Sequence, residues 1–149
     1  MAVSDDQGAD GTRRAGATGI GGVFFKASDP QAIGRWYRDH LGVELEDPSG
    51  EGGASECTAM FRWRDADDPE RIGTTVWAAF PRDTPYFSPG DAPFMINYRV
   101  EDLDGLLERL RAEGVWVDEH RENHEYGRFA WIRDPDGNRI ELWEPPADG

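Results

Sequence analysis

The sequence contains two similar segments in tandem. They are Lys26–Glu46 (KASDPQAIGRWYRDHLGVELE) and Arg99–Glu119 (RVEDLDGLLERLRAEGVWVDE). In each copy an Asp that can cap a helix (Asp29, Asp102) precedes an amphipathic stretch, which ends at a Gly (Gly42, Gly114). Strand-like runs precede and follow each copy. The repeat therefore predicts an α+β chain of two tandem βαβββ modules, joined near Pro85–Asp91, whose sheet curves around a central cleft.

The positions of turn-forming residues set the expected boundaries of the tail, the two modules and their connection. Residues 1–18 lack a periodic pattern or an apolar signal-peptide core, so we expect a flexible tail there. Module 1 is expected at 19–84, module 2 at 92–146, and a short C-terminal end at 147–149. Residues 81–93 (PRDTPYFSPGDAP) hold four prolines, and we expect this connection to pack on the surface.

Composition narrows the classes of partner. The formal net charge is −14, which disfavours binding to nucleic acid or to anionic lipid. No apolar run approaches the roughly 18 residues of a membrane span. We therefore expect a cytoplasmic protein without nucleic-acid or membrane partners. The single cysteine, Cys57, lies in a strand-like run and is expected to be a small buried hydrophobe.

Three segments together resemble the vicinal oxygen chelate superfamily, which includes glyoxalases, extradiol dioxygenases and bleomycin-resistance proteins. They are GGVFFKASDPQAIGRWYRDHLGVEL, FMINYRVEDLDGLLERLRAEGV and FAWIRDPDGNRIELWEP. The resemblance covers roughly residues 19–146. It implies a half-open barrel of paired βαβββ modules, a small-molecule ligand and a homodimer that completes the barrel.

The resemblance also implies where metal ligands would stand. Metal-dependent relatives place them on the first and last strand of each module, and those places here hold Gly22, Trp77, Met95 and Glu141. A catalytic metal site generally needs about three protein ligands from His, Asp, Glu or Cys. One carboxylate does not supply that set, so we expect no metal of the family type and no cofactor.

Strand alternation predicts which side chains face the cleft together with Glu141. The expected lining is Phe24, Lys26, Thr75, Trp77, Met95, Asn97, Arg99, Arg139 and Trp143. Such walls suit a planar, partly aromatic molecule held by stacking and a few hydrogen bonds. The favoured hypothesis is a metal-independent protein that binds such a molecule.

Three alternatives stay open at this stage. The aromatic side chains could pack together and fill the barrel, leaving no cavity. Glu141 could form a structural salt bridge with Lys26, Arg99 or Arg139, because a buried carboxylate needs a partner. The chain could instead be a lyase or isomerase that uses Glu141 as a base, or as one ligand of an unconventional metal site with His120 or His124. These two histidines are otherwise expected in a solvated polar loop.

Overall fold

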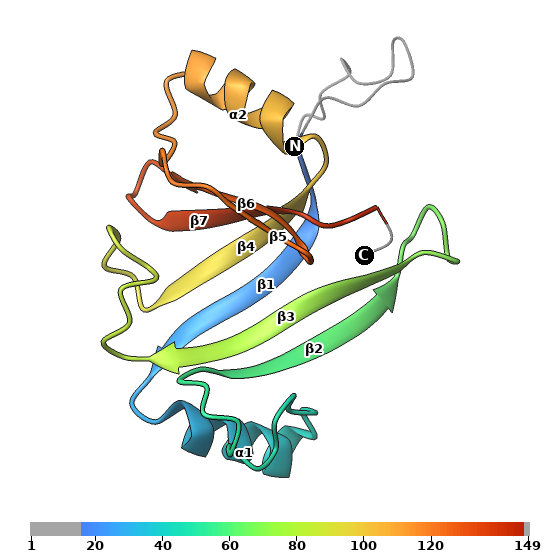
Figure 1. Cartoon of the computed structure of the whole chain (residues 1–149), viewed down its shortest axis with the longest axis vertical. Helices are drawn as coiled ribbons and strands as arrows, with labels where there is room; N and C mark the ends of the chain where they lie inside the picture. Colours follow the sequence, from blue (N-terminus) through green and yellow to red (C-terminus); the bar gives the residue numbers. More distant parts are fainter. Residues whose placement is uncertain (1–15, 148–149) are drawn as a thin grey trace.

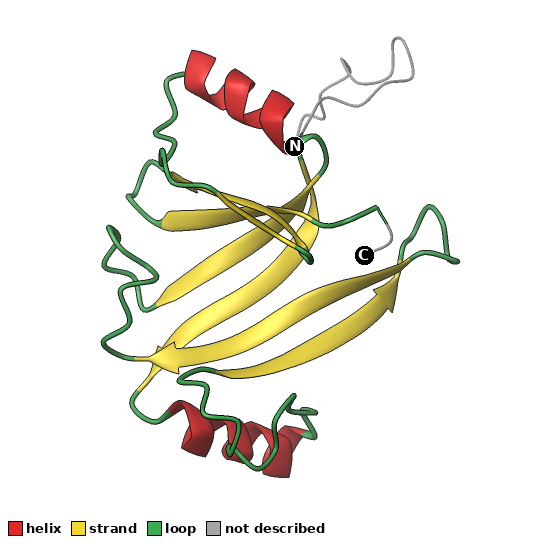
Figure 2. Ribbon diagram, in the orientation of Figure 1, coloured by secondary structure: helices red, strands yellow, loops and turns green. Residues whose placement is uncertain are grey.

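A computed structural model describes residues 16–147 and folds them into one curled sheet with two helices (Figures 1 and 2). The elements of the first half are β1 (Ala17–Ala27), α1 (Pro30–Leu41), β2 (Cys57–Arg64) and β3 (Ile72–Pro81). Those of the second half are β4 (Phe94–Val100), α2 (Leu103–Ala112), β5 (Glu122–His124), β6 (Gly127–Arg133) and β7 (Arg139–Glu144). Neither helix in this part of the chain has the length and apolar character that a membrane crossing requires.

The strand order relates the two halves by an approximate two-fold axis. The sheet runs β2-β3-β1-β4-β7-β6-β5, with β1 antiparallel to β4 at its centre. Gly22 pairs with Asn97, and Phe24 pairs with Met95. Exchanging the halves therefore maps Gly22 onto Met95 and Phe24 onto Asn97. The predicted α+β fold, two tandem modules that form a half-open barrel, is confirmed.

Three local predictions differ from the structure. The strands expected directly after each helix are reduced to isolated bridges, Leu45 with Ala59 and Val117 with Ile132. The polar loop expected around His120 and His124 contains the short strand β5, which pairs with β6. β1 begins at Ala17, inside the predicted tail, and residues 1–15 of that tail lie outside the described residues.

Both helices lie outside the curl of the sheet, one on each half (Figure 1). Asp29 caps α1 by accepting from the backbone N–H of Ala32 at 3.1 Å, and Gly42 ends it in the left-handed region at φ 71°. The core under α1 includes the buried Cys57, as expected, together with Trp77. α2 covers a second core built around Leu106 and Leu107.

The connection between the modules packs into the protein, and not merely on its surface as the sequence suggested. It carries Phe87, whose ring is only 1% exposed. Phe87 belongs to a third core on the inner face of the sheet, together with Phe24, Ala78, Met95 and Trp131. Burial of an aromatic side chain removes a large apolar area from water, which fixes the segment over the sheet.

Candidate functional site

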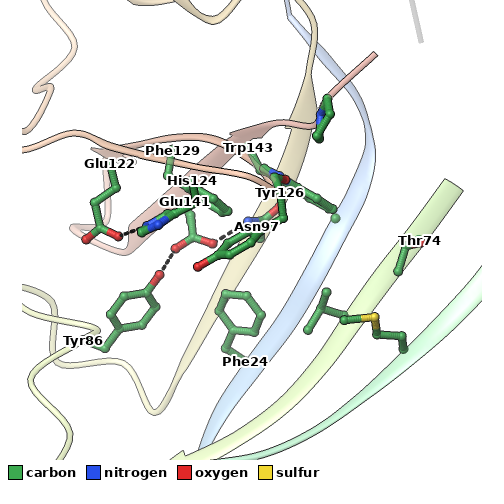
Figure 3. Close-up of a pocket in the computed structure, with 14 residues that line it drawn as sticks. Phe24, Thr74, Tyr86, Asn97, Glu122, His124, Tyr126, Phe129, Glu141 and Trp143 are labelled. Carbon is green, nitrogen blue, oxygen red and sulfur yellow. Dashed lines mark hydrogen bonds and ion pairs between the residues drawn. The ribbon is translucent and has the colours of Figure 1, made fainter. Parts of the chain in front are cut away.

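A pocket of about 510 Å³ opens on the inner face of the curled sheet, beside the inner-face core (Figure 3). Five aromatic rings line it: those of Phe24, Tyr86, Tyr126, Phe129 and Trp143. This volume lies in the range that holds a small organic ligand. The barrel is therefore only partly filled by its aromatic side chains.

Glu141 lies at the base of the pocket and is 1% exposed. Its carboxyl group accepts hydrogen bonds from three uncharged donors, and Figure 3 shows those from Tyr86 and Asn97. Asn97 Nδ2 donates to Oε1 at 2.5 Å, Trp131 Nε1 donates to Oε2 at 3.0 Å, and the Tyr86 hydroxyl also donates to Oε2. Neutral donors thus satisfy the carboxyl group. The salt bridge to Lys26, Arg99 or Arg139 that sequence reasoning allowed is not formed.

The sheet register brings these groups together. Glu141 on β7 pairs with Asn97 on the parallel strand β4 and with Trp131 on the antiparallel strand β6. Side chains of paired residues point to the same face, so all three meet on the inner face. Tyr86 comes from the connection between the modules, and its ring stacks on Phe80 at 5.3 Å.

Burial sets the protonation of this group. Loss of solvent raises the pKa of Glu141, and the three donors oppose that rise without cancelling it. The pKa of Tyr86 is also raised, first by its own burial and then by the adjacent Glu141. The pocket floor can thus hold a neutral acid, or a carboxylate that readily accepts a proton.

The rim of the pocket carries a second acidic group with two imidazoles. Glu122 on β5 pairs with His124 at 2.8 Å and with His120 at 2.9 Å. Hydrogen bonds from His124 and then His120 hold the pKa of Glu122 below its usual value. Glu122 and His124 both line the pocket, so this part of the expected polar loop forms its wall.

A family model matches residues 19–142, and its description is the Glyoxalase/Bleomycin resistance protein/Dioxygenase superfamily. The chain belongs to this superfamily. A comparison with curated proteins gave no significant match.

Solved structures of other superfamily members have the same fold. Methylmalonyl-CoA epimerase from Mycobacterium tuberculosis is 24% identical, with a TM-score of 0.56 over 87% of this chain and 89% of that one. A Streptomyces coelicolor methylmalonyl-CoA epimerase variant is 20% identical, with a TM-score of 0.63 over 89% and 100%. A superfamily member from Vibrio splendidus 12B01 is 13% identical, with a TM-score of 0.51 over 82% and 95%. At these identities the likeness shows the fold alone.

The predicted site residues fall into three groups. Phe24, Asn97, Glu141 and Trp143 line the pocket. Others lie on the inner face without lining it: Met95 is in the inner-face core, Lys26 lies over the ring of Phe87, Arg139 contacts Asp118, and Arg99 contacts Trp143. Thr75 and Trp77 do not belong with either group.

The prediction that Thr75 and Trp77 face the cleft with Glu141 is wrong. Trp77 packs under α1 against Tyr37, at 5.2 Å between ring centroids. Thr75 donates to the backbone carbonyl of Ile20 and accepts from Trp63, away from the pocket. β3 lies one residue out of the register that the sequence predicted, and such a slip moves every side chain to the other face.

The register also corrects one of the four metal-ligand positions. Phe24 pairs with Ala78, just as its two-fold counterpart Asn97 pairs with Glu141. Ala78, and not Trp77, is thus the counterpart of Glu141.

The corrected set for this superfamily's metal is Gly22, Ala78, Met95 and Glu141. It offers one carboxylate and no imidazole, and the other three residues provide no hard donor. Within residues 16–147, no three His, Cys, Asp or Glu side chains gather into a group that could hold a metal ion. The residues present do not fit the family-type metal.

Several pocket residues were missed by sequence reasoning. They are Met60, Thr74, Val76, Tyr86, Glu122, Tyr126 and Phe129, with Trp131 beneath. Phe129 and Trp131 are two positions apart on β6, so their spacing in the sequence already indicates that they share one face of the sheet. Tyr86 lies in an irregular segment, and no periodic pattern indicates where its side chain points.

Proposed function

We propose that this protein binds a small, planar, partly aromatic molecule in the inner-face pocket, without a metal ion. The observation that carries the proposal is the combination of an apolar cavity with one buried carboxyl group at its floor. Aromatic walls favour a flat ligand by stacking, and a single anchored polar group orients it.

The fixed position of the Glu141 carboxyl group supports ligand binding, in addition to the shape of the pocket. Glu141 is held by donors from three separate segments, so its position is fixed before any ligand arrives. A preorganised polar group costs little additional ordering when a ligand binds. The family membership supports a small-molecule role in general terms and does not specify the compound.

Titration calorimetry with 1-naphthalenemethanol, a flat neutral probe, tests this proposal. We expect saturable binding in the titration. In a separate thermal melt, the melting temperature should rise with probe concentration. Thr74→Trp, which fills the pocket wall, should weaken binding at least tenfold. Ile72→Trp changes an exposed residue of the same strand outside the lining and is the matched control. Absence of binding, or equal binding by both variants, would count against the proposal.

Proton transfer by Glu141 is a second candidate function. The raised pKa of this carboxyl group favours it, because a base works best with a pKa near the working pH. The similar solved structures include methylmalonyl-CoA epimerases, but they support the fold only. Deuterium exchange at the α-carbon of 2-indanone, followed by NMR, tests the chemistry. Faster exchange with the wild-type protein, lost in Glu141→Gln, would support a role for Glu141 as a base. Equal acceleration by the wild type and the variant would exclude that role.

A further inference from the structure

We propose that the pocket selects planar ligands that carry a protonated nitrogen, such as aromatic ammonium or amidinium compounds. The inference rests on the proposed function and adds the charge class of the ligand. Three features support it: the charge of the lining, an acceptor at the floor without a partner, and the aromatic walls.

Acidic side chains predominate among the ionisable groups of the lining. Glu141 at the floor and Glu122 at the rim are acidic, and no Lys or Arg is found among the described residues that line the pocket. His124, the remaining titratable nitrogen group there, is engaged by Glu122 at 2.8 Å. An anionic ligand would therefore meet two acidic groups without a Lys or Arg to oppose them.

The basic side chains of the inner face do not line the pocket, and each is engaged by other groups. Lys26 lies over the ring of Phe87 at 5.5 Å, Arg139 donates to Asp118 at 3.1 Å, and Arg99 lies 5.1 Å from the rings of both Trp63 and Trp143. Arg99 also donates to the backbone carbonyl of Thr74 at 3.2 Å. Lys26, Arg99 and Arg139 were predicted to bind the ligand. The contacts given above explain their positions without a role in recognising the charge of a ligand.

Asn97 provides an acceptor at the floor of the pocket. Its side chain is buried and lines the pocket, and Oδ1 has no hydrogen-bond partner in the described part of the chain. Its Nδ2 is used by Glu141. Oδ1 is itself buried against Gly21, which lines the pocket, so a donor group of a ligand has to displace this contact to reach it. A buried acceptor without a partner favours a ligand that brings an N–H donor.

The aromatic walls complete the match. Rings attract a cation over their faces, and the attraction is stronger where water is excluded. Phe129 stacks parallel to Trp143 at 6.1 Å, and Tyr126 stacks on His124 at 4.8 Å, so the walls are themselves ordered. A flat cation can contact these rings while its N–H groups reach Glu141 and Asn97.

Three naphthalene probes of one shape and different charge test the inference: 1-naphthalenemethylamine, 1-naphthalenemethanol and 1-naphthoic acid, titrated at pH 7. We expect the amine to bind at least tenfold more tightly than the alcohol, and the acid to bind most weakly. A smaller advantage for the amine, or tighter binding of the acid, would overturn the inference while the proposed function stands. Failure of all three to bind would overturn both.

Charge-removing variants locate the selectivity. Glu141→Gln should reduce the ratio of amine to alcohol affinity to below threefold. Glu122→Gln, at a half-exposed rim position, should reduce the ratio at least twofold. Glu108→Gln, on the exposed face of α2, is the matched control and should leave the ratio unchanged. An undiminished ratio in both pocket variants would overturn the inference.

Discussion

Replacing Glu141 by Gln should change how the stability of the protein depends on pH. The carboxyl group is buried, and burial raises its pKa in the folded state above that of the unfolded chain. The folded protein therefore binds this proton more tightly than the unfolded chain does. The contribution of Glu141 to stability is fully present below the unfolded pKa, near 4.3, and is lost as pH rises through the folded pKa.

The size of the effect follows from this linkage. Between the two pKa values, the free energy of unfolding of the wild type should fall relative to the variant by up to about 1.4 kcal/mol per pH unit. Gln can keep the network: its carbonyl oxygen accepts from Tyr86 and Trp131 at the Oε2 position, and its amide faces Asn97 after that amide flips.

Urea denaturation of both proteins at intervals from pH 4 to pH 8 provides the measurement. The difference between the two curves removes the contribution of the other carboxylates, which both proteins share. A flat difference, or a wild type that gains stability over the variant as pH rises, would refute the claim that burial dominates the electrostatics of Glu141.

Three further predictions concern the connection, the packing of α1 and the metal. Phe87→Ala should lower the free energy of unfolding by about 3–5 kcal/mol, because its ring is buried in the inner-face core; a loss below about 1 kcal/mol in urea denaturation would mean that the segment merely covers the surface. Gly34→Ala should cost about 1–3 kcal/mol, since the added Cβ would clash with Cys57 Sγ, and adding Cys57→Ala should restore most of that loss in a double-mutant cycle. Elemental analysis of protein purified without chelators should find transition metals well below one equivalent, because Glu141 alone does not complete a ligand set; a stoichiometric ion lost in Glu141→Gln would contradict this.

Much of the fold could be predicted because its signals are local. Asp29 followed by Pro30 begins a helix wherever it occurs with a periodic apolar face, and the second copy repeats the pattern at Asp102. Alternation along β4 and β7 placed Asn97 and Glu141 on one face, because each strand has a clear apolar side packed under α2.

The rest depends on contacts that local pattern does not encode. β3 is apolar on both faces, with Trp77 under α1 and Ala78 in the inner-face core, so composition alone does not reveal its register. The hydrogen bond from Tyr86 to Glu141 joins residues 55 positions apart in the chain. Only the folded arrangement shows that an irregular connection supplies a donor to the pocket floor.

The pairing of Asn97 with Glu141 in one half, and of Phe24 with Ala78 in the other, gives the cavity a direction. A barrel made of two identical halves could bind an asymmetric ligand in either of two orientations related by the two-fold axis. Here the equivalent positions in the two halves differ in polarity: one end of the cavity carries Asn97 and Glu141, and the other carries Phe24 and Ala78. A ligand with one polar end should therefore bind in a single orientation.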